Sequence, residues 1–249
     1  MKSFLTALSM AWGMFSAIPC PLRRWEDRLR PLMLVCFPLV GLLVGALWAL
    51  CAWLIHLAGG LGLFGAGLLT VLPFLCTGFI HLDGFMDCCD AILSRRDLPE
   101  RQRILKDPHV GSVAVICVVL LFLLEFGLFG TMAHPIPYGL LAAVPLAARC
   151  PAAIAVMTLR PMGTSSYAGS FETGVRTTHR IALALLTAAA LLLPLLLSGL
   201  AGLCAAAAAA GSTLVIAYGV HQLGGMSGDI SGFAVTLGEF CGLLALTFL

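Results

Sequence analysis

Hydrophobic and polar positions fall into long alternating blocks along this chain. Apolar runs of about 20 residues, each long enough to cross a bilayer as a helix, are separated by short segments that hold most of the charges. Hydropathy predicts seven membrane-spanning helices, at residues 32–57, 60–80, 111–133, 137–159, 181–199, 202–220 and 230–249. The roughly ten-residue alternation of a membrane β-barrel is absent. We therefore expect an all-α, polytopic membrane helical bundle in which residues 1–249 form a single membrane domain.

The first thirty residues carry a different pattern. Apolar side chains recur on one helical face, at Phe4, Leu8, Ala11, Phe15 and Ile18, while small and hydroxyl side chains occupy another. A basic stretch from residue 23 to residue 30 follows. We expect an N-terminal amphipathic helix that lies in the membrane interface instead of crossing the bilayer.

Basic residues are distributed unevenly among the connecting segments. If the N-terminus is cytoplasmic, 13 of the 14 Lys and Arg residues lie on the cytoplasmic side, and the connections near residues 59, 134 and 200 carry none. Lys and Arg in short loops mark the cytoplasmic side of a membrane protein. We expect cytoplasmic segments at residues 81–110, 160–180 and 221–231, in a multi-pass protein of the cytoplasmic (inner) membrane.

The amino-acid composition also indicates a membrane protein, and it limits the binding partners that we expect. The chain is 60% hydrophobic and 10% charged, whereas soluble proteins average about 25% charged residues. Its expected surroundings are the lipid bilayer, and no nucleic-acid partner is expected. Most of the ten cysteines lie in apolar runs and no CxxC pair occurs, so neither disulfides nor a zinc site is expected. Glycine and alanine permit contacts between copies of the chain without specifying any.

The segment from His81 to Asp90 holds three aspartates, Asp83, Asp87 and Asp90, at spacings of four and three. On a helix these residues share one stripe, and no basic residue lies between them to offset their repulsion. A divalent cation would offset it, and an all-carboxylate set suits Mg²⁺ better than zinc or copper. The alternative is a solvated acidic face. The position beside a membrane span favours a functional metal site.

A basic loop follows the aspartates directly. Residues 94–106 contain five cations and two acids, which the positive-inside rule alone could explain. Arg and Lys beside a metal site are also what a substrate with a pyrophosphate group requires. Gly111 and Ser112, at the start of the next span, would let backbone N–H groups approach an anion.

A second polar island lies between the last two spans. Residues 223–232 contain four glycines in addition to Asp229, including Gly225 and Gly228, and glycine allows unusual backbone angles or close approach to a ligand. Asp229 is expected on the same membrane face as the other aspartates, where it would complete or bridge the metal site.

Three charges lie inside predicted spans, at Glu125, Arg149 and Glu239. Buried ionisable residues usually face a partner or a polar cavity. Arg149 can pair with either glutamate, and a structural ion pair and a role in lining a substrate cavity both remain open. Arg160, at the cytoplasmic end of its span, is a candidate phosphate contact.

Together these residues make the chain resemble the cobalamin synthase (adenosylcobinamide-GDP ribazoletransferase) family. The resemblance covers nearly the whole length. It rests mainly on the block His81-Leu82-Asp83-Gly84 through Asp87, Asp90 and Arg101 to Lys106-Asp107 and Gly111, with support from Phe15-Ser16-Ala17-Ile18-Pro19, Phe37-Pro38-Leu39-Val40-Gly41, Arg149, Arg160, Gly163, Gly224-Gly225, Gly228-Asp229 and Glu239. Cys88-Cys89 and Ser227 depart mildly from the family pattern without removing a charge.

The resemblance implies a phosphotransferase of late cobalamin biosynthesis. Adenosylcobinamide-GDP and α-ribazole, or its 5′-phosphate, would be joined with release of GMP by an in-line displacement that depends on Mg²⁺. Asp83, Asp87 and Asp90 would bind the metal with Asp229 assisting, and His81 or one aspartate would accept the hydroxyl proton. The candidates for holding phosphates are Arg95, Arg96, Lys106, Arg149 and Arg160, with Gly225 and Gly228 allowing close approach.

Two alternatives remain. A lipid-head-group phosphotransferase of the CDP-alcohol type would share the aspartate and Mg²⁺ chemistry, but this chain lacks the complete signature of that family. A cation-coupled transporter would use Glu125, Arg149 and Glu239 as coupling residues. Transporters place their sites near the bilayer midplane and often show internal repeats, whereas here the aspartates lie at the expected cytoplasmic edge and no repeat is evident.

Overall fold

The computed structural model describes residues 2–22, 24–132, 137–163 and 174–249. In these ranges every regular element is a helix, which confirms the all-α prediction. The elements are α1 (Lys2–Phe15), η1 (Asp27–Leu29), α2 (Arg30–Leu57), α3 (Gly62–Thr77), α4 (Ile80–Leu93), α5 (Leu98–Ile104), α6 (Ser112–Thr131), α7 (Tyr138–Thr158), α9 (Thr177–Ser198), η2 (Gly199–Gly202), α10 (Leu203–Leu223) and α11 (Gly228–Phe248). Arg23 and residues 164–173 of the predicted segment 160–180 lie outside the described residues.

Helices occupy all seven predicted ranges, but the number of spans differs from the prediction. Five helical stretches in the described residues are long and apolar enough to cross a membrane, and a sixth is reached if α3 and α4 form one bent span. One of the five, Thr177–Leu223, contains both α9 and α10. Gly202 lies against the backbone of Pro194, eight residues earlier. Only glycine fits this close contact, and it allows the chain to reverse at η2.

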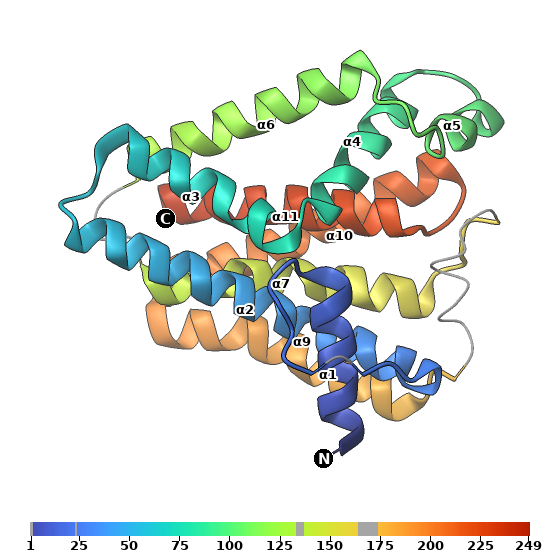
Figure 1. Cartoon of the computed structure of the whole chain (residues 1–249), viewed down its shortest axis with the longest axis horizontal. Coiled ribbons are helices and arrows are strands. Elements are labelled where there is room, and N and C mark those ends of the chain that lie inside the picture. The colour runs from blue at the N-terminus through green and yellow to red at the C-terminus, as the bar shows by residue number, and fades with distance from the viewer. Residues whose placement is uncertain (1, 23, 133–136, 164–173) are drawn as a thin grey trace.

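The helix in the predicted span at residues 60–80 is shorter than predicted, because α3 ends at Thr77 and the chain then turns. Gly78 and Phe79 adopt left-handed backbone angles, with φ of 61° and 63°, and α4 leaves α3 at 95°. A non-glycine residue with positive φ is uncommon and marks a locally enforced turn. The aspartate segment is helical, as its spacing predicts, and this helix turns away from α3 toward the end of the bundle that carries α5 (Figure 1).

The N-terminal helix runs across the long helices, as Figure 1 shows. Its buried face is rotated from the predicted one: Phe4 is 44% exposed, whereas Thr6 and Ser9 are buried. The Ser9 hydroxyl donates a hydrogen bond to the Leu22 carbonyl, so the following segment folds back over this face. The predicted face is confirmed in part, because Ala11 and Phe15 are buried. Thr6 and Ser9 are buried as well, since a polar side chain can be buried when its hydrogen bond is satisfied.

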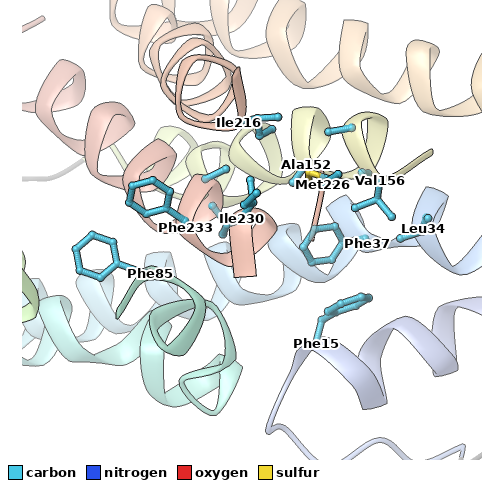
Figure 2. Close-up of a cluster of buried hydrophobic side chains, with 14 of the residues drawn as sticks. Phe15, Leu34, Phe37, Phe85, Ala152, Val156, Ile216, Met226, Ile230 and Phe233 are labelled. Carbon is cyan, nitrogen blue, oxygen red and sulfur yellow. The ribbon is translucent and has the colours of Figure 1, made fainter. Parts of the chain in front are cut away.

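The core consists of two clusters of buried apolar side chains, one of which is drawn in Figure 2. In that cluster Phe85 of α4 lies beside Phe233 of α11, with ring centroids 5.9 Å apart. Phe15 of α1 contacts Phe37 of α2 at a centroid distance of 4.4 Å. This packing joins α4 to α11 and α1 to α2, so the aspartate helix is held by the most buried part of the bundle.

The connections gather at the two ends of the long helices (Figure 1). The end of α4, α5, the residues after α7 and the α10–α11 connection lie at one end, which we call the loop end. The α2–α3 and α9–α10 turns and the carboxyl end of α11 lie at the other. The segments that carry most of the polar candidates therefore meet on one side, as the charge distribution predicts.

Candidate active site

The aspartate stripe begins with α4 itself. Because Ile80–Leu93 is helical, Asp83, Asp87 and Asp90 follow one side of it. Asp83 is exposed, while Asp87 and Asp90 are partly buried. The stripe runs along α4 toward the loop end (Figure 1).

Asp229, the fourth predicted carboxylate, is brought to this stripe by the contact between α4 and α11. Gly84 lies over the backbone of Asp229, where a Cβ would meet the carbonyl oxygen at 2.7 Å. The charges of Asp83, Asp90 and Asp229 all act on Asp87. Asp229 is 139 or more positions from the α4 aspartates in the sequence, yet it joins them in one acidic centre. Glycine at position 84 makes the close approach of α4 to α11 sterically feasible.

Asp90 has a structural partner that the sequence did not indicate directly. Its two carboxylate oxygens accept hydrogen bonds from the backbone N–H groups of Gly111, at 2.7 Å, and Ala114, at 2.8 Å. Asp90 therefore caps the N-terminus of α6, where a negative charge is favourable. The anion predicted at Gly111 and Ser112 is, in this structure, the side chain of Asp90.

The acidic centre fits a divalent cation in composition. No Lys or Arg of the described residues forms an ion pair with Asp83, Asp87, Asp90 or Asp229. Within the same ranges, no three His, Cys, Asp or Glu side chains already converge tightly enough to hold a metal ion. Oxygen donors without a compensating cation suit Mg²⁺, which also retains several waters when it binds. The carboxylates would close around such an ion.

His81 lies on the other side of α4 from Asp83. Its side chain is 6% exposed, its ring centroid is 5.7 Å from that of Phe37, and its Nε2 has no hydrogen-bond partner. The Thr236 hydroxyl donates to its backbone carbonyl at 3.2 Å. This position does not fit the predicted alternative of His81 as the base, because residues two apart on a helix face different ways.

Arg149 is enclosed in the bundle, where its Nη1 is bound by protein groups while its Nε and Nη2 have no hydrogen-bond partner. It is 0% exposed, and its Nη1 donates to Glu239 at 2.5 Å and to the Pro145 carbonyl at 2.9 Å. Glu125 is also buried, with Glu239 as its charged neighbour. The arrangement favours the structural alternative for Arg149 over the predicted phosphate contact, since a fully buried guanidinium is closed to a substrate.

The remaining predicted cations lie at the loop end. Arg95, Arg96, Lys106 and Arg160 are all exposed. Arg95 follows the end of α4 with a left-handed φ of 56°. Exposed cations near an acidic centre can contact the phosphates of a bound substrate without competing with a metal for the carboxylates.

Residues of α5 that were not among the predicted site residues hold this loop in place. Arg101 donates to the side chain of Gln222, and the Gln102 amide donates to the Leu223 carbonyl at 2.8 Å. Both bonds attach α5 to the end of α10. In the sequence, Arg101 belongs to the block that carries the family resemblance and Gln102 is a polar residue of a basic loop. Neither feature distinguishes a docking contact from a solvated side chain.

Gly225 allows two backbone segments to pack closely, and it does not leave open space for a phosphate. A Cβ at Gly225 would lie 2.6 Å from the backbone of Met162. Next to it, the Met226 N–H donates to the Arg160 carbonyl and the Met162 N–H donates to the Met226 carbonyl, each at 2.9 Å. The contact ties Arg160 to the α10–α11 connection. Gly228 is the first residue of α11, and its predicted approach to a phosphate stays a prediction.

Beyond α5, Asp107 is bound by its neighbour His109. The His109 Nδ1 lies 2.7 Å from the Asp107 Oδ1, and the His109 backbone N–H donates to the same oxygen at 3.0 Å. These hydrogen bonds hold the pKa of Asp107 below its usual value. Asp107 is thus a charged member of a turn that leads into α6, and it does not take part in the acidic centre.

Comparison with known proteins decides the family. The cobalamin-5-phosphate synthase family profile matches residues 7–247, which is nearly the whole chain. The chain belongs to the cobalamin-5-phosphate synthase family. This confirms the resemblance drawn from the aspartate block, and the match includes α1 and α11 at the two ends of the fold.

Similar full-length proteins of three bacteria bear one name. An adenosylcobinamide-GDP ribazoletransferase of Clostridium perfringens is 36% identical over 99% of both chains. The enzyme of that name from Clostridium botulinum is 34% identical over 98% of both chains. The one from Geobacillus kaustophilus is 33% identical over 96% of this chain and 94% of the relative. No solved structure matches this chain.

Proposed function

We propose that this chain is an Mg²⁺-dependent adenosylcobinamide-GDP ribazoletransferase. The observation that carries the proposal is the approach of Asp229 on α11 to the aspartate stripe of α4, in a chain with exposed arginines at the loop end and with full-length relatives that bear that name. The substrates would be adenosylcobinamide-GDP and α-ribazole or its 5′-phosphate, and the products would be the corresponding cobalamin and GMP.

The reaction is a phosphoryl displacement in which one P–O bond forms and another breaks. A ribose hydroxyl oxygen that is free in both α-ribazole and its 5′-phosphate attacks the phosphorus that carries the cobinamide group, and the bond from that phosphorus to the GMP oxygen breaks. GMP leaves with the electron pair of that bond, and the hydroxyl proton passes to an aspartate of the stripe. His81 is not proposed as the acceptor because it faces Phe37.

Each group of residues has a separate part in this scheme. Asp83, Asp87 and Asp229 would hold Mg²⁺, which supplies charge neutralisation at the diphosphate. Asp90 holds the start of α6 against α4. Arg95, Arg96, Lys106 and Arg160 are placed at the loop end to bind phosphate oxygens.

The proposed location is the cytoplasmic membrane, with the loop end in the cytoplasm. The structure supports it by gathering the basic segments at one end of the apolar helices. Nucleotide-activated substrates would then meet the acidic centre on the side where nucleotides are made. The opposite end, with its short turns, would face away from the cytoplasm.

The test is GMP release by the purified full chain in detergent with adenosylcobinamide-GDP, α-ribazole and Mg²⁺. We expect Mg²⁺-dependent release, and we expect Asp83→Asn to lower kcat by at least about 100-fold, a typical contribution of one catalytic group. Asp27→Asn is the matched control, because Asp27 is an exposed aspartate that pairs with Arg30 away from α4. Full activity of Asp83→Asn would overturn the metal-site proposal.

The same preparation separates the two alternatives. A lipid-head-group phosphotransferase would release nucleotide with diacylglycerol as acceptor and not with α-ribazole. A transporter would accumulate substrate in sealed vesicles and release no GMP in detergent. Among the transporter's candidate coupling residues, Arg149 and Glu239 are already engaged with each other, which favours the transferase.

A further inference from the structure

An apolar groove lies on the flank of the molecule, away from the acidic centre. It has a volume of about 720 Å³ and runs between α7, α9 and α10. Its walls include Pro151 and Leu159 of the α7 segment, Thr187 and Leu191 of α9, and Ala206 and Val220 of α10. Ala210, Thr213 and Ala217 form an exposed stripe of small side chains along it. The groove is therefore open to whatever surrounds the bundle.

The groove offers no hydrogen bonds to a polar ligand. The hydroxyls of Thr158, Thr187 and Thr213 donate to backbone carbonyls of their own helices, at 2.7, 2.8 and 2.8 Å. The other lining residues are apolar. An occupant of this surface must accordingly be a hydrocarbon, because a polar group placed here would lose its hydrogen bonds to water without replacement.

The groove is long enough to hold the acyl chain of one bilayer leaflet. Its lining on α10 extends from Ala206 to Val220, which at the helical rise spans about 21 Å. The hydrocarbon core of a bilayer is about 30 Å thick, so one leaflet is about 15 Å. A single acyl chain that enters from the loop end can thus lie in the groove along its whole length.

Positive charge stands at the loop end of the groove. Arg180 lies two turns before Thr187 on the same stripe of α9, and Arg160 follows the end of α7 directly after Leu159. Both side chains are exposed, and neither has an acidic partner among the described residues. Arginines at this depth face the phosphate layer of the membrane and attract anionic head groups.

We propose that the groove is a binding site for an anionic phospholipid, with one acyl chain between α7, α9 and α10 and the head-group phosphate at Arg180 and Arg160. The apolar walls bind the acyl chain of the lipid, and the arginines favour a negatively charged head group. The groove lies apart from the acidic centre. Arg160 is shared with the proposed transferase site, whereas Arg180 belongs to the lipid site alone, so a test on Arg180 does not depend on the transferase reaction.

A second copy of the chain is a poorer occupant of this surface. Most contacts between identical subunits are two-fold, so that the same patch meets itself. A two-fold contact centred on the charged end of the groove would bring the arginines of one copy against those of the other. Repulsion of like charges would oppose that contact, whereas an anionic lipid would neutralise them.

The experiment uses the full chain in phosphatidylcholine vesicles that contain spin-labelled phosphatidylglycerol or spin-labelled phosphatidylcholine. Electron paramagnetic resonance measures the fraction of each lipid immobilised by the protein. For the wild-type chain we expect a higher relative affinity for phosphatidylglycerol. Arg180→Gln is expected to reduce that preference about fivefold, in line with the usual effect of one basic residue near a membrane surface. Lys2→Gln, at an exposed lysine of α1, should leave it unchanged.

A second variant tests the hydrocarbon part of the site. Ala210→Phe fills the groove and should reduce the immobilised fraction of both lipids. Leu214→Phe, at a 71% exposed position of the same helix outside the groove, should not. The proposal is overturned if the wild-type chain shows no preference for phosphatidylglycerol or if Arg180→Gln retains it. A change of oligomeric state in Ala210→Phe, with lipid binding intact, would overturn it in favour of a second copy.

Discussion

Asp90 shows how one residue can match a motif and still act differently from its neighbours. The stripe at positions 83, 87 and 90 predicts three metal ligands, yet both oxygens of Asp90 accept backbone N–H groups at the start of α6. The remaining lone pairs of this carboxylate could also bind a metal, but the contacts that the structure shows are the hydrogen bonds of the helix cap. Measurements of stability and of metal binding can distinguish a helix cap from a metal ligand.

We expect Asp90→Ala to lower the free energy of unfolding by about 1 to 2 kcal/mol, the usual cost of a lost N-cap. Thermal or denaturant unfolding in detergent measures it, and Mn²⁺ binding followed by paramagnetic resonance should persist. Asp97→Ala, which removes the cap of the short helix α5, is the control for a cap outside the acidic centre. Loss of Mn²⁺ binding at unchanged stability would instead show that Asp90 is a metal ligand.

At the scale of elements, the seam between α4 and α11 decides where the carboxylates meet. Gly84 lies against the Asp229 backbone and Gly232 against the His81 backbone, where Cβ atoms would come within 2.7 and 2.9 Å. The two helices can approach this closely only because glycine lacks a Cβ. The acidic centre is thus a consequence of helix packing as much as of the charged residues.

We expect Gly84→Ala to push α4 away from α11 and reduce GMP release at least about tenfold, with weaker Mn²⁺ binding. Overpacking of this kind typically costs about 1 to 3 kcal/mol of stability. Gly127→Ala on α6 is the matched control, because a Cβ there meets nothing within 4 Å. If Gly84→Ala binds Mn²⁺ as tightly as the wild-type chain, the seam does not position the site.

The sequence predicted the helices and the shared end of the polar segments because hydrophobic blocks and the charge distribution are properties of the chain alone. It did not predict the 95° turn at Gly78 and Phe79, since nothing local marks Phe79 as left-handed. The contact of Asp229 with α4 was expected only as a shared membrane face. The burial of His81 and Arg149 depends on how four helices cross, which a periodic pattern does not specify.

For the whole molecule, the buried ion pair of Arg149 and Glu239 joins α7 to α11. We expect Glu239→Gln to lower stability by about 3 kcal/mol or more, because it leaves a buried guanidinium without its counter-charge. The melting temperature in detergent is the measurement. Glu100→Gln, which breaks an exposed pair with Arg103, should change it little.

The double variant Arg149→Met with Glu239→Leu provides the complementary result. Apolar residues of similar size often replace a buried ion pair without loss of stability, so the double variant should melt near the wild-type temperature. If Glu239→Gln alone melts like the wild-type chain, the pair does not hold the two helices together.

The carboxyl end of α11 lies at the end of the bundle opposite the loops (Figure 1). A reporter enzyme fused after Leu249 would therefore sit in a different aqueous compartment from one inserted beside α5. Alkaline phosphatase, which matures only outside the cytoplasm, should be active at the first position and silent at the second. Such a pair of fusions gives the absolute orientation of the protein in a living cell without any substrate.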